Sequence, residues 1–416
     1  MNMNKTRFFT VMLGTLLSAT LLSVAQTIGQ ASNSPAAPAA FAASVSEQLT
    51  ELMRAVNDAE RATLKEKGTN EDRLWKVYAS LNATTIPKII DLAAQDAGSP
   101  TAFISCEWVV TNRQVDAGAR KLVPYGLKAV ELLRDHGGAT NPAVAPVCWA
   151  IGHNWDYRHK PSQEFLQEVL AKNPDRDARG NATYALARLK KQESEMLGWL
   201  KIAPDYMSDE WRKSAVEEAK TTDSLTVRRE AERLFESVIQ TYSNTPVPVK
   251  PELMLGERAT EELYELQHLS IGQVAPEIDG EDLDGQKLKL SDYRGKIVLL
   301  SFWGSWCGPC MQMIPHERKL AESLAGKPFA VVGVNSDVKL LDAKRAIEQK
   351  QITWPSFWCG TNGNDGPIPT AWNVKGWPTV YVLDPKGTIR LKLEGFGGTN
   401  TDNILSKTLD RLLKEQ

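Results

Sequence analysis

Apolar residues follow two different spacings along this chain. Between about residues 44 and 242 they recur every three or four positions, as at Ile86, Ile89 and Ile90, and this spacing predicts amphipathic helices. From about residue 268 they gather in short runs of strand length, at 297–303, 329–334, 380–383 and 389–393. The pattern therefore predicts an all-α part followed by a mixed α/β part.

The helical part carries a weak internal repeat. Three helix-like runs are each followed by a turn that contains a proline (Pro100, Pro142 or Pro174) and then by a second helix-like run. Helix pairs of this kind bury their apolar faces by stacking on neighbouring pairs, which predicts a short HEAT-like solenoid. A helical bundle without repeats would show the same periodicity, so both architectures stay open.

The α/β part is expected to run in the order hairpin, strand, helix, strand, helix, strand, strand, helix. The turn Asp284-Gly285 marks the first hairpin, and residues 384–387 form the turn between the last two strands. Helices are predicted over 311–324 and 403–413.

Composition adds further boundaries. Prolines at 246, 248 and 251 predict a linker, and a connecting helix is expected over 257–268. The Ala/Pro-rich stretch at 26–43 predicts a tether. The expected segments are a signal peptide (1–25), the tether (26–43), a helical domain (44–242), the linker with its helix (243–267) and the α/β domain (268–416).

The N-terminus has the pattern of a secretory signal. Lys5 and Arg7 precede an apolar run from Phe8 to Val24, and small residues allow cleavage after Ala25. We therefore expect a periplasmic or secreted protein, with an uncleaved membrane anchor as the alternative. The formal net charge is −2 and the pI about 6.3, so neither nucleic acid nor an anionic membrane surface is expected as a partner.

Five cysteines are too few for a disulfide scaffold. Cys106 and Cys148 follow their turn prolines at the same distance, so they are either two buried thiols or a structural disulfide. Cys359 is either a buried spectator or a third redox thiol.

Cys307 and Cys310 lie two residues apart at a predicted strand-to-helix turn, in Trp306-Cys307-Gly308-Pro309-Cys310. Unpaired N–H groups and partial positive charge at a helix N-terminus favour a thiolate at Cys307. Lowering a cysteine pKa from about 8.5 to about 7 makes the thiolate a substantial fraction at neutral pH. A static disulfide or half of a zinc site are the alternatives, but no second CxxC or histidine pair supports zinc.

The region from about 268 to 416 resembles the TlpA/ResA-type extracytoplasmic thiol–disulfide oxidoreductases of the thioredoxin superfamily. The residues that carry the resemblance are 272–276, 290–296, the run 301–310, Pro315, Trp372 and 374–379. The resemblance implies a thioredoxin-like α/β fold after the all-α domain. It also implies that Cys307 is the exposed attacking thiol and Cys310 the resolving thiol, linked to substrate through a mixed disulfide.

Further roles follow from the same resemblance. Pro378 matches the family's cis-proline, which brings the backbone before it beside the dithiol, where a substrate strand can pair. Substrate contacts are expected from Trp306, Gly308, Pro309, Trp377, Pro378 and Thr379. No cofactor is expected beyond the redox-active disulfide. The expected partners are a protein disulfide substrate, a membrane-bound thiol electron donor and a protein that docks on the helical domain.

One residue departs from the thioredoxin pattern. Ser301 stands where thioredoxins proper carry a buried Asp that helps move protons to the resolving thiol. Serine cannot act as a base at neutral pH, so another carboxylate or a chain of waters is expected to do this work.

Two other functions compete with disulfide reduction. A thiol peroxidase needs Thr or Ser three residues before its reactive cysteine, and Gly304 occupies that place. Alternatively, the helical domain is a protein-binding scaffold and the redoxin domain is its accessory. The Gly-Pro dipeptide between the cysteines resembles reducing members of the superfamily more than strong oxidants.

Overall fold

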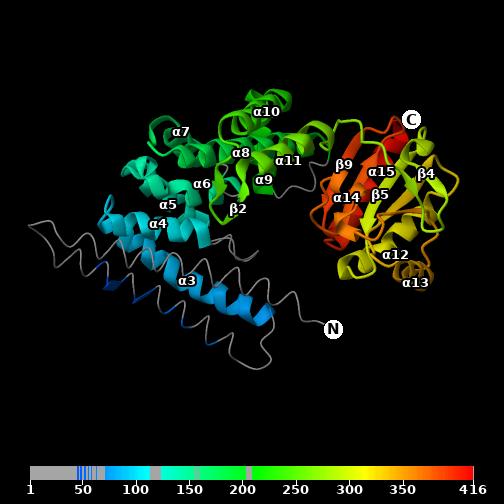
Figure 1. Ribbon diagram of the computed structural model, residues 1–416, viewed down its shortest axis with the longest axis horizontal. Helices are drawn as coiled ribbons and strands as arrows, with labels where there is room; N and C mark the ends of the chain where they lie inside the picture. The colour runs from blue at the N-terminus through cyan, green and yellow to red at the C-terminus, as the bar shows by residue number, and fades with distance from the viewer. Residues whose placement is uncertain are drawn as a thin grey trace, which may run out of the picture. The chain divides into compact units, whose positions relative to one another are not determined.

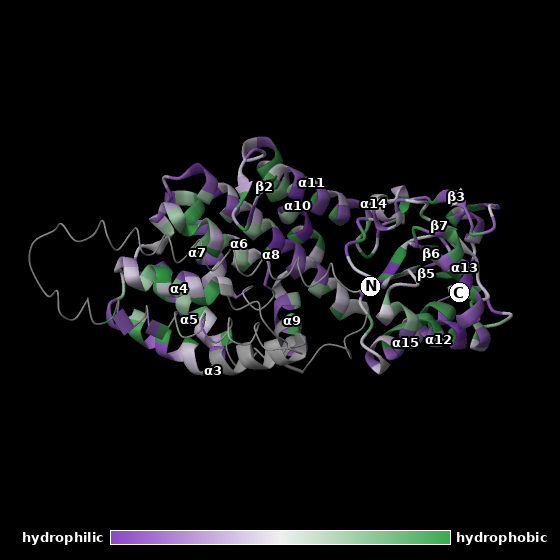
Figure 2. Cartoon of the chain, turned by 60° about the horizontal axis from the view of Figure 1, so that its bottom comes forward, coloured by the Kyte–Doolittle hydropathy of each residue, from purple (hydrophilic) through white to green (hydrophobic). Residues whose placement is uncertain are grey.

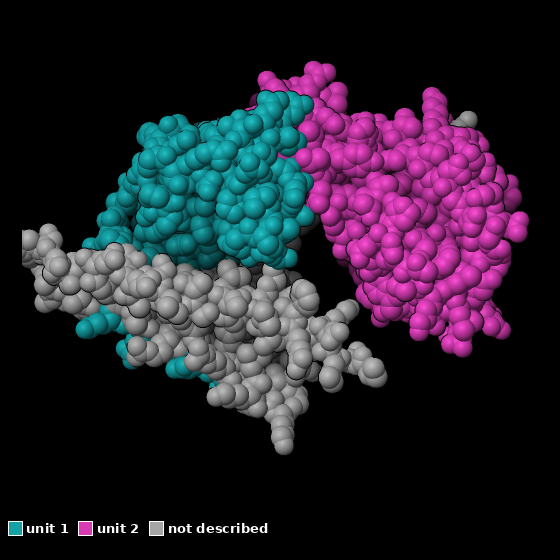
Figure 3. Space-filling model, in the orientation of Figure 1, with its two compact units in different colours: residues 1–189, 234–258 teal, residues 190–233, 259–416 magenta. Residues whose placement is uncertain are grey.

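The computed structural model describes residues 71–112, 123–154, 157, 159–202 and 209–415, with isolated positions between 45 and 62 (Figure 1). The predicted signal peptide and tether lie outside the described residues. In the described part, no helix combines the length and apolar character needed to cross a membrane. Contacts divide the chain into two compact units, residues 1–189 with 234–258 and residues 190–233 with 259–416 (Figure 3).

The first part of the chain is helical, as its periodicity predicts. The helices are α3 (Glu71–Gln95), α4 (Pro100–Asn112), α5 (Val123–Asp135), α6 (Ala145–Gly152), α7 (Lys160–Lys172), α8 (Arg176–Ile202), α9 (Asp209–Thr221) and α10 (Ser224–Thr241). Apolar side chains from α3 to α8 form one core, in which residues such as Ile89, Val130 and Phe165 are fully buried. Burial of this apolar surface is the main stabilising term for such a stack.

The three proline turns each separate two helices, because proline cannot continue a helix but suits its first turn. Asn173, in the third turn, donates hydrogen bonds from Nδ2 to the carbonyl oxygens of Ala139 and Asn141, in the second turn, at 2.7 and 2.9 Å. This contact is what stacked pairs would show, while the HEAT-like repeat itself stays a prediction.

Cys106 and Cys148 are free and buried in this core. Burial raises the pKa of the Cys106 thiol to about 12 and that of Cys148 as well. The structure therefore agrees with the interpretation of two inert thiols rather than with a structural disulfide.

The proline-rich segment predicted as a linker contains a short antiparallel hairpin, β1 (Pro246–Val247) with β2 (Lys250–Met254). It leads into α11 (Leu255–His268), which covers the connecting helix expected over 257–268. Prolines are tolerated here because each strand of a two-stranded ladder is an edge strand, where an N–H that faces away from the partner has no ladder hydrogen bond to lose.

The second unit contains a five-stranded sheet in the order β7-β6-β5-β8-β9. Its strands are β5 (Ile297–Trp303), β6 (Phe329–Asn335), β7 (Ser356–Trp358), β8 (Thr379–Leu383) and β9 (Ile389–Glu394). β5, β6 and β7 run parallel, whereas β8 and β9 are antiparallel to their neighbours. The sheet is preceded by the hairpin β3 (Asp279–Glu281) and β4 (Lys287–Lys289). This mixed sheet confirms the predicted thioredoxin-like α/β fold.

Side chains of β5 alternate between the two faces of the sheet, as the strand period of two requires. Leu299 and Trp303 join the core under α12 (Gly308–Ser323), α13 (Leu340–Lys350) and α15 (Thr399–Lys414), whereas Leu300 and Phe302 face the opposite core beside α14 (Pro367–Ala371). α12 and α15 carry apolar and polar residues together in Figure 2, as helices that cover one face of a sheet do. Strand β7 and helix α14 are additions that the sequence pattern does not indicate.

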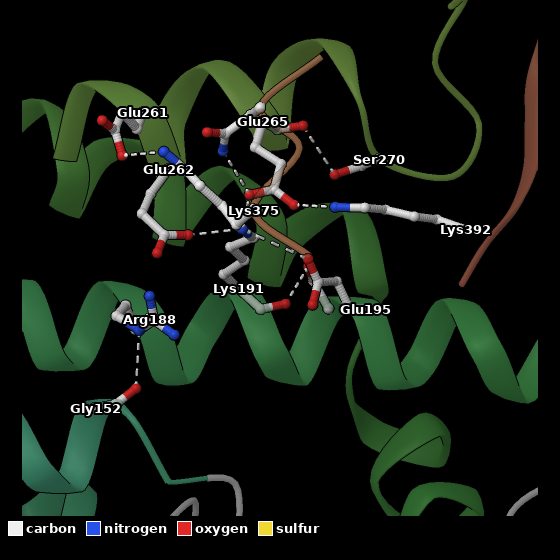
Figure 4. Close-up of polar contacts among 12 residues, drawn as sticks. Gly152, Arg188, Lys191, Glu195, Glu261, Glu262, Glu265, Ser270, Lys375 and Lys392 are labelled. Carbon is white, nitrogen blue, oxygen red and sulfur yellow. Dashed lines mark hydrogen bonds and ion pairs between the residues drawn. The ribbon is translucent and has the colours of Figure 1, made fainter. Parts of the chain in front are cut away.

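A buried network of charges lies within this second unit (Figure 4). Lys191 of α8 lies 2.6 Å from Glu262 and 2.9 Å from Glu265 of α11. Glu265 also pairs with Lys392 of β9 and accepts a hydrogen bond from Asn373. Burial alone would raise the pKa of Glu265, but Lys191 and Lys392 outweigh it and lower that pKa to about 2. The network therefore ties the end of α8 and α11 to the sheet.

Candidate active site

The two cysteines of the CxxC sequence lie where β5 passes into α12. β5 ends at Trp303, and α12 begins at Gly308 with Cys307 as its N-cap. Cys307 and Cys310 form a disulfide, with their Cα atoms 5.2 Å apart. Cys307 Sγ accepts a hydrogen bond from the Cys310 backbone N–H at 3.1 Å. A backbone N–H of the first helical turn, which has no partner within the helix, thus donates to this sulfur, and this arrangement favours a thiolate there.

Both sulfurs are shielded in this disulfide form. Cys307 is 5% exposed and Cys310 is 1% exposed. The expectation of an exposed Cys307 is therefore wrong for this form, although the order of exposure is the expected one. The residues that reach solvent are its neighbours Trp306, Gly308 and Pro309, of which Trp306 is 47% exposed. They surround the more accessible sulfur.

Two tryptophans from distant parts of the chain meet beside the disulfide sequence. The rings of Trp306 and Trp377 lie edge to face, with centroids 5.6 Å apart. The Trp377–Pro378 peptide bond is cis. Pro378 and Thr379 are buried, and Thr379 Oγ1 donates to the Gly376 carbonyl oxygen at 2.8 Å. The side chain of Thr379 therefore packs inside the domain, and Trp306 and Trp377 form the apolar rim.

The loop before Cys307 is held by a residue that the sequence reasoning missed. Asp337, just after β6, accepts hydrogen bonds from Ser305 N at 3.0 Å, Ser305 Oγ at 2.6 Å and Asn335 Nδ2 at 2.7 Å. Trp377 Nε1 donates to Ser336 Oγ at 3.3 Å. The polar residues 335–337 therefore position the loop that carries Trp306 and also hold Trp377. In the sequence, these residues could have been singled out because they follow the carboxyl end of a predicted parallel strand, where binding sites occur.

A second missed residue is Glu317 of α12, a carboxyl group only 2% exposed. Burial raises its pKa to about 7, and a hydrogen bond from the Ser301 side chain lowers it in part. Ser301 itself is 1% exposed and lies on β5 between Leu299 and Trp303, whose side chains share its face of the sheet. A buried carboxyl group thus contacts the serine that replaces the usual Asp. Its spacing from Cys310, seven residues along one helix face, was a signal in the sequence.

Other residues that the sequence singled out lie outside this constellation. Trp303 is buried, and its Nε1 donates to Ser356 Oγ at 3.4 Å. The side chain of His316 is 40% exposed and its Nδ1 lies 2.6 Å from Asp402. Cys359 belongs to the core on the opposite face of the sheet, and burial raises its pKa to about 12. This placement favours the interpretation of Cys359 as a buried spectator.

Among the described residues, no group of three or more His, Cys, Asp or Glu side chains is placed so that it could hold a metal ion.

Comparisons with known proteins place the similarity in the second unit. The sequence model of the AhpC/TSA family matches residues 271–392. The thioredoxin-like protein YneN of Bacillus subtilis (strain 168) is 37% identical over 142 residues, which cover 33% of this chain and 78% of that protein. The thiol-disulfide oxidoreductase ResA of Geobacillus kaustophilus (strain HTA426) is 30% identical over 127 residues, which cover 30% and 71%. A solution structure of a thiol:disulfide interchange protein from Bacteroides sp. shares 30% identity, with a TM-score of 0.31 and coverage of 34% of this chain and 91% of that one.

Proposed function

This chain belongs to the TlpA/ResA-type thiol–disulfide oxidoreductases of the thioredoxin superfamily, and we propose that it acts outside the cytoplasm as a reductant of protein disulfides. The observation that carries the proposal is the Cys307–Cys310 disulfide at the N-terminus of α12, with the Cys310 N–H directed at Cys307 Sγ.

The reaction proceeds by two exchanges of sulfur partners. In the reduced form, the Cys307 thiolate attacks one sulfur of the substrate disulfide, and the other substrate sulfur leaves as a thiolate with the electron pair of the broken bond. Cys310 then attacks Cys307 Sγ, the bond to substrate breaks and the second substrate thiol leaves. The substrate has gained two electrons, its two released sulfurs take their protons from the solvent, and the chain holds the disulfide seen here.

The rim of Trp306 and Trp377 is the surface that meets the substrate. Trp306 is half exposed and next to the attacking cysteine, and aromatic side chains supply apolar contact without fixing one sequence. We assign Gly308, Pro309 and the backbone before Pro378 to the same surface.

Export is supported by the N-terminal sequence, with its basic residues and apolar run before Ala25. An oxidising compartment restores no thiols, so each cycle requires a thiol donor at the membrane to reduce the Cys307–Cys310 disulfide. The helical part would position the redoxin or dock its partner.

The peroxidase alternative is disfavoured by the space around Gly304. A Cβ atom added at Gly304 would lie 2.5 Å from Trp306 Nε1 and 2.7 Å from Cε2. A threonine or serine three residues before Cys307 would therefore displace the tryptophan of the rim.

The test is turnover of a small protein with one accessible disulfide by the full chain, supplied with dithiothreitol below the level that reduces the substrate directly. We expect catalytic release of substrate thiols and no peroxide consumption. Peroxide turnover without disulfide reduction would overturn the assignment.

A further inference from the structure

Glu317 is the one buried carboxyl group on the disulfide-bearing helix α12 whose surroundings the function above does not explain. Its side chain is 2% exposed, and its Oε1 has no hydrogen-bond partner among the residues that the structure describes. A buried polar atom without a partner costs free energy of folding, so it calls for a reason. Glutamine or leucine at this position would avoid the cost of burying an ionisable group.

Helix geometry places Glu317 on the face that carries Cys310. Cys310, Ile314 and Glu317 follow the spacing of four and then three residues that lines one side of a helix, and all three are buried. The Cα atoms of Cys310 and Glu317 are separated by about 10 Å along the axis. Long side chains in a helix point back towards its N-terminus, so the carboxyl group of Glu317 extends towards the turn of Cys310.

Ser301 of β5 contacts the Glu317 carboxyl group from the sheet. Its side chain hydrogen-bonds the Glu317 carboxyl group and lies on the β5 face that packs against Cys307, Cys310 and Met313. Ser301 pairs in the ladder with Val380, two residues after Pro378. The carboxyl group therefore lies in the layer between α12 and the sheet, beneath the disulfide.

No charged side chain is among the causes that shift the pKa of Glu317. β5 and β6 carry no titratable side chain. Several ionisable side chains of α12, α13 and α15 contact other groups: His316 contacts Asp402, Arg318 contacts Gln351, Lys344 contacts Asp284, Arg345 contacts Asp342, and Arg411 contacts Glu415. The causes that act on the Glu317 carboxyl group are burial and the bond from Ser301, and Cys310 is the buried acid on the same face of α12.

Resting on the function proposed above, we infer that Glu317 binds the proton that Cys310 loses when it resolves the mixed disulfide. The Cys310 S–H bond breaks, its sulfur forms the bond to Cys307 Sγ, and the bond between Cys307 and the substrate sulfur breaks. The substrate leaves with the electron pair of that bond, and the proton stays on the Glu317 carboxylate until reduction returns it to Cys310. Ser301 positions the carboxylate by donating to it.

Two negative charges, on Cys310 and on Glu317, would be costly to bury in the same layer. Cys310 is 1% exposed, and burial opposes thiolate formation. A carboxylate that takes the proton keeps the net charge of the layer constant. A pKa of about 7 suits this exchange near neutral pH. Below that pH the Glu317 carboxyl group is already protonated and cannot accept a proton from Cys310. The rate at which Cys310 resolves the mixed disulfide should therefore increase as the pH rises through about 7.

The experiment follows a single turnover of the reduced full chain with 5,5′-dithiobis(2-nitrobenzoate) by stopped flow. The probe releases one coloured thiolate when Cys307 attacks and a second when Cys310 resolves, so the two steps are seen separately. In Glu317→Gln, the first phase should keep its rate. The second should slow by roughly 100-fold at pH 8 and lose its inflection near pH 7.

Two further variants make the test specific. Ser301→Ala removes the bond that lowers the carboxyl pKa, so the inflection of the second phase should move to higher pH. Glu322→Gln changes an exposed acid of the same helix and should match the unaltered chain. If the rate of the second phase in Glu317→Gln equals that of the unaltered chain, the inference is overturned. If Glu317→Gln does not fold, Ser301→Ala decides, and an inflection that stays at the same pH in that variant overturns the inference. Loss of the second phase in the unaltered chain would instead overturn the proposed function.

Discussion

A Cys310→Ala variant of the full chain is expected to accumulate mixed disulfides with protein substrates and to lose turnover to background. Cys307 keeps its place at the N-terminus of α12, so its attack on a substrate disulfide still occurs. Without the sulfur of Cys310, no internal thiol can attack Cys307 and release the substrate. Non-reducing electrophoresis of the variant after incubation with a periplasmic or secreted protein extract should show adducts that thiols remove.

Two control variants decide whether the trap reports on Cys307. Cys307→Ala with Cys310→Ala should form no adducts, because the attacking sulfur is gone. Cys359→Ala removes a buried cysteine on the other face of the sheet and should leave turnover unchanged. Adducts that persist in the double variant, or none in Cys310→Ala, would contradict the roles given to the two cysteines.

A Lys191→Met variant is expected to destabilise the second unit by about 3 kcal/mol, because breaking a buried ion pair leaves an uncompensated charge. Glu262 and Glu265 would lose their shared cation at 2.6 and 2.9 Å. Because the pKa of Glu265 is lowered from 4.5 to about 2, its contribution is present above pH 4.5 and is lost as the pH falls towards 2. Urea denaturation at pH 7 and at pH 3, followed by tryptophan fluorescence, measures both effects.

The matched control is Lys220→Met. Lys220 and Glu217 form an exposed pair at 2.6 Å on α9, and such pairs contribute roughly 0–1 kcal/mol. If the two lysine variants lose the same free energy of unfolding, the network around Glu265 does not hold this unit together.

The strands and the CxxC helix could be predicted from sequence because their signals are local. The run 297–303 is apolar except at Ser301 and forms one central strand, β5, which is buried at every position. The boundary between the compact units was not accessible in the same way. Composition changes near 242 and 268, but residues 190–233 pack with the sheet unit through pairs such as Lys191 with Glu265. Partners this far apart in sequence leave no local pattern.

At the active site, the sequence indicated the reacting sulfurs but not the groups that hold them. Cys307 and Cys310 are recognisable because two thiols at a strand-to-helix turn have few other uses. Asp337 and Glu317 are ordinary acids in the sequence. Their importance comes from burial and from bonds to Ser305 and Ser301, which exist only once β6, β5 and α12 are packed together. The sequence did indicate that Ser301 cannot act as a base and that another group must move the proton.

The reduction potential of the Cys307–Cys310 pair in the full chain decides whether the protein removes or inserts disulfides. The protein is equilibrated in dithiothreitol buffers of defined potential, and the fluorescence of Trp303 and Trp306 reports the oxidised fraction. A reductant of protein disulfides predicts a value near or below the roughly −270 mV of thioredoxin. A value near the roughly −120 mV of a strong oxidant would contradict the account, because the chain would then insert disulfides rather than remove them.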